Sequence, residues 1–179
     1  MIIQITGTPG VGKTTVSNLL KDKLDANLVA INELVDKKHL YTGIDEVKGY
    51  KIVDMDALFD ELNNIVEKTD KSNYIIIEGH LSHFYENSDI VIVLRANPDV
   101  LRERMDVKCW KDAKINENIE AEIIGICSYE AYEIHGEKVN EIDTSNISPQ
   151  EVSNTIIDVI KHDKKFPVGD VDFVDYLRI

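Results

Sequence analysis

Residues 7–15 read GTPGVGKTT and combine the residue types that bind phosphate groups. They contain the pattern G-x-x-x-x-G-K-[ST] between an apolar run and an amphipathic segment, which disfavours the alternative of an ordinary glycine turn. Glycines let backbone N–H groups curl around phosphate oxygens, and the following helix adds the positive end of its dipole. We expect Lys13 to reach the β- and γ-phosphates of a nucleoside triphosphate and the Thr14 hydroxyl to ligate Mg²⁺. The pattern thus predicts a loop that binds ATP or a related triphosphate.

A carboxylate and two histidines follow the apolar run 75–77. Nucleotide-binding folds of this kind keep an acid at such a strand end to hold Mg²⁺ directly or through water, which makes Glu78 a candidate metal ligand. A strand-end acid that merely begins a loop is the alternative. His80 and His83 come next, and a neutral imidazole at His80 could orient an attacking water or accept its proton. The alternative for both histidines is a place on the surface of the loop.

Arginine is absent before Arg95, and three arginines then occur within ten residues. Arg95 closes the apolar run 90–94, so we expect its guanidinium at the same sheet edge as Lys13, where it would neutralise a transferring phosphoryl group. Arg102 and Arg104 point to different sides of the next helix. We expect Arg104 to face the site and Arg102 to form solvated pairs.

The elements that must hold these side chains alternate along the chain. Five apolar runs predict short buried strands, and apolar residues at helical spacing lie between them. Cap residues begin three of the helices, at Asp54 or Asp56, at Asn97 and at Ser148. The pattern predicts an α/β fold, a five-stranded parallel sheet with helices on both faces, whose ligands bind beyond the carboxyl ends of the strands. The expected strands cover residues 2–5, 28–31, 74–77, 90–94 and 139–142.

Two polar stretches interrupt this alternation, at residues 32–54 and 107–117. Long irregular segments in a compact domain are more often functional lids than padding, so we expect insertions over the site. A variable surface loop is the alternative for each. The second stretch carries three lysines that would either touch phosphates or form a solvated loop face, namely Lys108, Lys111 and Lys114.

The remaining part of the chain predicts helices and a tail. Ile119, Ile123 and Ile126 have helical spacing and predict one helix. The tail 161–179 either packs on the body or waits for a partner. Residues 1–179 are expected to form a single domain, since a chain of this length buries about 70% of the surface that its unfolded form exposes.

The net charge of −13 and the absence of an apolar run long enough to span a membrane narrow the function classes. Such acidity opposes the capture of naked nucleic acid and fits a basic protein partner, with acidity for solubility alone as the alternative. The N-terminus carries no signal region, which predicts a cytoplasmic protein without a membrane role. Cys109 and Cys127 lack metal-ligand spacing and are expected to be free thiols.

Together these residues resemble the small adenylate-kinase-like proteins of archaea and eukaryotes that are associated with maturation of the small ribosomal subunit. The resemblance spans nearly the whole chain. It rests on six segments in this order: residues 6–15 (TGTPGVGKTT), Leu40-Tyr41 with Gly43 and Asp45-Glu46, Glu78-Gly79-His80, Val93-Leu94-Arg95, Glu103-Arg104, and Asn118 to Glu122.

The resemblance implies a P-loop NTPase fold of the nucleoside-monophosphate-kinase type, with an acceptor-binding insert near residues 30–53 and a short lid near 107–117. It implies conversion of ATP and AMP to two ADP with Mg²⁺, an additional ATPase activity, and binding of a basic small-subunit ribosomal protein during ribosome biogenesis and rRNA processing. It assigns Glu78 to the metal and His80 to the hydrolytic step. The residues that would line the triphosphate are Gly10, Gly12, Lys13, Thr14 and Thr15, with Lys108 in the lid.

Three departures from the family pattern concern the metal and the phosphates. Glu78 stands where aspartate is more usual, which lengthens the reach to Mg²⁺ by one methylene and favours contact through water. Lys108 stands where the lid commonly begins with arginine, so a point charge takes the place of a planar fork. The insert offers residues 36–38 (DKK) where relatives often have arginine, which leaves an acceptor phosphate to lysines or to Arg95.

Three functions follow from these observations. The leading one is phosphotransfer from ATP to AMP or another nucleoside monophosphate, with Arg95 and Arg104 on the transferring group. The second is an ATP-gated assembly factor with negligible kinase activity, whose hydrolysis is assisted by His80. The third is a small-metabolite kinase with an insert at 32–54 shaped for something other than a nucleotide. A GTPase is disfavoured because the sequence contains no Asn-Lys-x-Asp segment.

Overall fold

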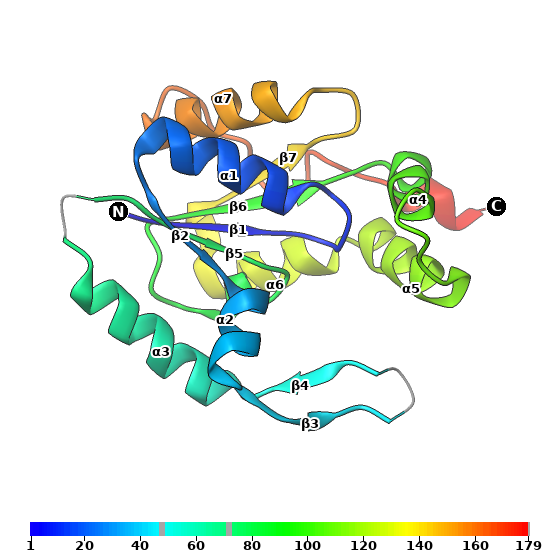
Figure 1. The fold of residues 1–179 in the computed structure, drawn as a ribbon. Helices are drawn as coiled ribbons and strands as arrows, with labels where there is room; N and C mark the ends of the chain where they lie inside the picture. Colours follow the sequence, from blue (N-terminus) through cyan, green and yellow to red (C-terminus); the bar gives the residue numbers. More distant parts are fainter. Residues whose placement is uncertain (47–48, 71–72, 179) are drawn as a thin grey trace.

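A computed structural model describes residues 1–46, 49–70 and 73–178. Residues 47 and 48 of the predicted insertion, and residue 179 of the tail, lie outside the described residues. Five parallel strands form the main sheet, and they are the five that the sequence predicts (Figure 1). In spatial order they are β2 (Asn27–Ala30), β5 (Ile75–Glu78), β1 (Ile2–Thr6), β6 (Ile90–Arg95) and β7 (Val139–Asp143).

Helices cover both faces of this sheet, as predicted for the P-loop NTPase fold (Figure 1). Helices α1 and α7 lie on one face, and α3 and α6 lie on the other. The helices are α1 (Lys13–Leu24), α2 (Ile31–Lys38), α3 (Met55–Lys68), α4 (Pro98–Asp106), α5 (Asp112–Ile123), α6 (Ile126–His135) and α7 (Pro149–Ile160). Short 3₁₀ turns occur at η1 (Ser82–Phe84), η2 (Gly136–Lys138) and η3 (Val174–Arg178).

The apolar runs form buried strands because their side chains alternate between two covered faces. In β1, Ile3 and Ile5 pack with α1 and α7, whereas Ile2 packs with α3. In β6, Ile92 faces the first of these clusters and Val93 packs against α6. A strand with both faces covered needs apolar residues at most positions, which is the pattern in the sequence. Gln4 of β1 and Asn140 and Glu141 of β7 are buried exceptions.

Three helix starts are confirmed by their caps. The Asp54 carboxylate accepts a hydrogen bond from Ala57 N at 3.1 Å, so Asp54 rather than Asp56 caps α3. Asn97 caps α4 in the same way, and Ser148 forms a full capping box at the start of α7. These caps fix the direction in which each helix leaves the sheet.

The predicted insertions are more regular than expected. Residues 31–53 contain α2 and an antiparallel hairpin of β3 (Tyr41–Ile44) and β4 (Lys51–Val53). In the 107–117 stretch, residues 107–111 form a short connection and the rest is the first part of α5. The prediction of irregular segments was wrong here because short polar helices and two-stranded hairpins carry weak apolar periodicity.

The single helix predicted through Ile119, Ile123 and Ile126 is also wrong. Gly125 adopts φ +65° and separates α5 from α6, which places Ile126 in a different helix. A Cβ at Gly125 would lie 3.3 Å from Arg95 Nη1, so the break is tied to the packing of that arginine. Neither constraint is visible in a periodicity of isoleucines.

The tail packs on the body, which decides between the two predicted alternatives (Figure 1). Phe166 N donates to Asn140 Oδ1 at 3.0 Å, and the Tyr176 hydroxyl donates to Asp99 Oδ2 at 3.1 Å. The ring of Phe173 is buried beside Arg95. The tail therefore contacts both the last strand and the start of α4.

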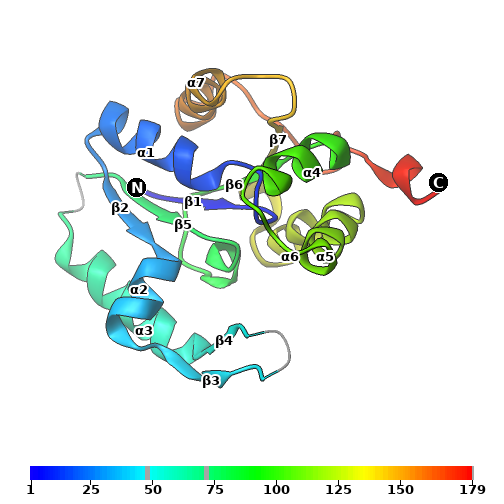
Figure 2. The same cartoon turned by 45° about the vertical axis from the view of Figure 1, so that its right-hand side comes forward.

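The hairpin and the α4–α5 pair lie at the end of the sheet where β1 leads into α1 (Figure 2). Lys114 of α5 lies 5.0 Å from the ring centroid of Tyr50, beside the hairpin, so the two segments meet. No helix within the described residues is long and apolar enough to cross a membrane. Ligands are expected at this edge, between the two flanking segments.

Candidate active site

The P-loop joins β1 to α1 and leaves the first turn of α1 open toward a ligand. Gly12 is the N-cap of α1 with φ +106°, and no side chain caps the helix. The first N–H groups of α1 are therefore free of side-chain acceptors and suit a phosphate. Gly7 has φ +130°, and a Cβ there would lie 2.3 Å from Leu94 O, so only glycine fits between the loop and β6.

Lys13 lies across the inside of this loop. Its Nζ donates to Gly7 O at 2.8 Å and to Thr8 O at 3.0 Å. Although Lys13 keeps part of its surface exposed, burial of the ammonium lowers its pKa from 10.5 to about 8, against the opposing charges of Glu78 and Glu122. Lys13 thus lies within the loop, and its environment reduces the fraction that is charged. Its reach to the phosphates stays a prediction.

Thr14 and Glu78 lie together although 64 residues separate them. The Thr14 hydroxyl donates to Glu78 Oε1 at 3.1 Å, at the carboxyl end of β5. A hydroxyl and a carboxylate are hard oxygen ligands, and Mg²⁺ is commonly held by one or two such groups together with phosphate oxygens and water. The pair fits that role. Within the described residues no group of three His, Cys, Asp or Glu side chains could hold a metal by itself.

The two histidines after β5 have different environments. His80 lies at the strand end with part of its surface exposed, but burial of its ring, with the positive charge of Lys13, lowers its pKa to about 4. His83 is buried, contrary to the surface alternative. Its Nδ1 lies 2.7 Å from Thr6 Oγ1 and its Nε2 lies 3.1 Å from Glu130 Oε2. His80 is thus a neutral imidazole at the site, and His83 fixes the loop beneath it.

A cavity of about 450 Å³ adjoins the P-loop. Arg104 forms part of its wall and donates to Val11 O, Thr144 Oγ1 and Thr144 O at 2.8–3.3 Å, so its guanidinium is held in place. The volume is within the range of small-ligand sites and suits the adenosine part of a nucleotide. Its walls include Gly10, Gly12, Thr15, Arg104, Lys108 and Thr144.

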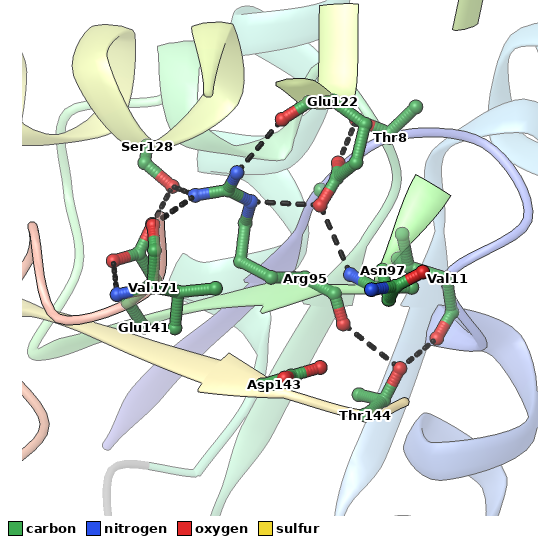
Figure 3. Close-up of polar contacts among 12 residues, drawn as sticks. Thr8, Val11, Arg95, Asn97, Glu122, Ser128, Glu141, Asp143, Thr144 and Val171 are labelled. Atoms are coloured by element: carbon green, nitrogen blue, oxygen red, sulfur yellow. Dashed lines mark hydrogen bonds and ion pairs between the residues drawn. The ribbon is translucent and has the colours of Figure 1, made fainter. Parts of the chain in front are cut away.

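Arg95 does not lie in the phosphate-binding cleft, which corrects the expected clamp. Its side chain is 3% exposed and forms ion pairs with Glu122 and Glu141 (Figure 3). Its Nε donates to Glu122 Oε1 and its Nη2 to Glu122 O, both at 2.7 Å. Burial by itself would lower the pKa of Arg95, but the two carboxylates raise it. Each guanidinium nitrogen donates to a protein oxygen, so Arg95 stabilises the interior of the protein.

Lys114, near the start of α5, lies beside the hairpin. Its Nζ lies 4.4 Å from the Trp110 ring centroid and 5.0 Å from that of Tyr50, and its charge is among those that lower the pKa of His80. Lys108 lines the cavity beside the P-loop instead. Residues 107–117 therefore place cations at two points, one beside that cavity and one facing the hairpin.

Two residues of the site were not identified from the sequence. Thr144 holds Arg104 and lines the cavity, and Glu122 binds both Arg95 and the P-loop residue Thr8. Thr144 follows β7 directly, so the rule that ligands bind beyond strand ends would have found it. In the sequence, Glu122 is marked only as an acidic residue on an apolar face of a helix.

This chain is similar to several known proteins. The family described as "AAA domain" matches residues 3–125. A "Putative adenylate kinase" of Methanothermobacter thermautotrophicus is 40% identical over 176 residues, covering 98% of this chain and 99% of that protein. One of the same name from Methanocaldococcus jannaschii is 42% identical over 183 residues, covering 100% of this chain and 98% of that protein.

Similar solved structures include the shikimate kinase from Acinetobacter baumannii in complex with shikimate. It is 17% identical with a TM-score of 0.65, covering 91% of this chain and 94% of that one. A shikimate kinase from Aquifex aeolicus is 21% identical with a TM-score of 0.57. At this identity the likeness shows the P-loop kinase fold alone.

We expect Arg95→Met to lower the free energy of unfolding by about 3–5 kcal/mol, because it leaves two buried carboxylates without their cation. Urea unfolding measures this change. Arg102→Met, on an exposed part of α4, is the control and should cost less than about 0.5 kcal/mol. An Arg95→Met protein as stable as the wild type would contradict the interior role of this arginine.

The pKa of about 8 at Lys13 predicts how binding depends on pH. Only the protonated ammonium attracts phosphate, so the affinity for a non-hydrolysable ATP analogue with Mg²⁺ should fall above pH 8, by about tenfold per pH unit. Calorimetric titration from pH 6.5 to 9.5 measures this fall. Lys13→Ala corrects for ionisation of the analogue, and a wild type no more pH-dependent than this variant would refute the prediction.

Proposed function

We propose that this chain, which belongs to the archaeal family whose members are named "Putative adenylate kinase", transfers the γ-phosphate of ATP to AMP or another nucleoside monophosphate. The observation that carries the proposal is the meeting of three features at one sheet edge. These are the open P-loop with Lys13, the adjacent Thr14 and Glu78 oxygens, and the cavity beside α4.

Each part of ATP has a place in this arrangement. The adenosine occupies the cavity beside Arg104, and the triphosphate follows the P-loop to the N-terminus of α1. Lys13 then leaves the loop carbonyls for the β- and γ-phosphates. Thr14 and Glu78 would hold Mg²⁺, which supplies neutralisation of the phosphate charge when it is bound.

The acceptor is best accommodated between the insert and the lid. Lys114 lies against Tyr50 at this junction and faces the same space as His80. An oxygen of the acceptor phosphate attacks the γ-phosphorus, the bond to the β,γ-bridging oxygen breaks, and two ADP are formed when the acceptor is AMP. Because such transfers need mainly positioning and charge stabilisation, Lys13 and Lys114 take the role first expected of Arg95, and Arg104 stays beside the adenosine.

The acceptor phosphate meets lysines rather than arginines in the insert. Lys38 pairs with Glu61 at 3.2 Å and Lys51 pairs with Asp36 at 2.5 Å, so both are partly neutralised. This observation favours a second candidate function, a kinase whose insert binds a small metabolite. It also supports a broad and weak preference among monophosphates.

ATP hydrolysis is a second proposed activity, and the environment of His80 supports it. A neutral imidazole that is exposed beside Lys13 can accept a proton from an attacking water. In this reading hydrolysis resets a complex with a basic small-subunit ribosomal protein, which the charge of −13 would favour. A nucleotide-independent affinity for such a protein would contradict the gating.

The first test is a coupled assay of the purified protein with ATP and Mg²⁺, with and without AMP. We expect two ADP per AMP consumed, and a fall in kcat of about 10²–10³-fold in Lys13→Ala, which removes a charge that stabilises the transferring group. ADP formation that ignores AMP and every other nucleoside monophosphate would refute the kinase. Phosphate transfer to a small hydroxylated metabolite alone would favour the small-metabolite kinase.

His80→Gln should separate the two activities. We expect AMP-independent phosphate release to fall by about 10²-fold or more, with phosphotransfer to AMP changed only a few-fold, because AMP brings its own nucleophile. In the wild type, release should be flat between about pH 5 and pH 8, above which Lys13 loses its proton, and should fall as the pH approaches 4, where His80 becomes protonated. His162→Gln, on the exposed surface, is the control. Equal losses in both activities would contradict a hydrolytic role.

A further inference from the structure

The P-loop is held from behind by a carboxylate of α5. The Thr8 hydroxyl donates to Glu122 Oε2 at 2.5 Å, and the two residues are separated by 114 positions in the chain (Figure 3). Thr8 is 2% exposed and Glu122 is 1% exposed, so water does not compete for this bond. Hydrogen bonds to a charged group in a buried place are the stronger kind.

The other oxygen of the Glu122 carboxylate is fixed to the sheet. Oε1 accepts from Arg95 Nε at 2.7 Å and from Ala96 N at 2.9 Å, at the end of β6. Arg95 is fixed in turn by Glu141 of β7, which also accepts from Gly169 N at 3.0 Å in the tail. Glu122 therefore holds Thr8 at a position set by two strands and the C-terminal segment.

Thr8 is the residue through which this hold reaches the phosphate site. Its carbonyl accepts from Lys13 Nζ at 3.0 Å and from Val11 N at 3.4 Å, across the turn of the loop. A shift of Thr8 would move both the loop backbone and the resting place of the lysine. Small displacements of groups that position a substrate are costly to binding and catalysis.

We propose that Glu122 is a positioning residue that keeps the P-loop in its phosphate-binding shape through the Thr8 hydroxyl, with Arg95 holding the carboxylate in place. Glu122 does not touch the nucleotide. Glu122 contributes to the affinity for the triphosphate rather than to the transfer step. The proposal rests on the proposed function for the identity of the ligand.

The test removes the link without disturbing the buried ion pairs. Thr8→Val keeps the shape of the side chain and deletes the hydroxyl, whereas Thr8→Ser keeps the hydroxyl. Ser128→Ala is the matched control, because Ser128 is a buried hydroxyl of the same network that bonds Arg95 and Glu141 and does not contact the P-loop. Each variant is titrated with a non-hydrolysable ATP analogue and Mg²⁺, assayed with ATP and AMP, and melted.

We expect Thr8→Val to raise the Kd of the analogue and the KM for ATP about tenfold or more, with kcat within about threefold and the KM for AMP unchanged. Thr8→Ser and Ser128→Ala should bind like the wild type, even if their melting temperatures fall. An unchanged Kd in Thr8→Val, or an equal rise in Ser128→Ala, would overturn the proposal. A wild type that binds the analogue but phosphorylates no monophosphate refutes the kinase and leaves this test valid.

Discussion

The buried charge of Arg95 is the constraint on which the arrangement of the site depends. A guanidinium without water must be surrounded by acceptors, and Glu122 of α5, Glu141 of β7 and Ser128 of α6 supply them (Figure 3). These partners come from three elements that follow β6 in the chain. Satisfying one side chain therefore fixes how α5, α6 and β7 meet at the end of the sheet. It also requires Gly125 between the two helices, because a Cβ there would crowd the guanidinium.

Because Arg95 is buried, other residues supply the positive charge in the cleft. The cations at the cleft include Lys13 on the P-loop, Arg104 held by Thr144, and Lys114 beside Tyr50. Of these, Lys13 is partly discharged by its own burial. Lysines interact with phosphate as point charges, whereas an arginine presents a planar fork.

Much of the fold followed from local patterns in the sequence. The five strands were predicted because a strand covered on both faces needs mainly apolar residues. The caps at Asn97 and Ser148, and a cap at either Asp54 or Asp56, were predicted because they act within one helical turn. The insert and the start of α5 were missed as regular structure. Their short polar elements have little periodicity, and they are stabilised by contacts such as Lys114 with Tyr50 that join distant segments.

The sequence by itself determined that a P-loop follows the central strand, that Thr14 and Glu78 belong to one sheet edge, and that the chain has a P-loop kinase fold. These conclusions hold because glycine conformations, strand ends and helix starts are local properties. Only the tertiary structure decided the direction of each charged side chain at that edge. The sequence pattern predicts both Arg95 and Arg104 at the edge of the sheet that carries the P-loop. In the structure, Arg95 is buried with Glu122 and Glu141, and Arg104 lines the cavity. That choice depends on carboxylates from elements far along the chain, and a pattern of neighbouring residues cannot contain it.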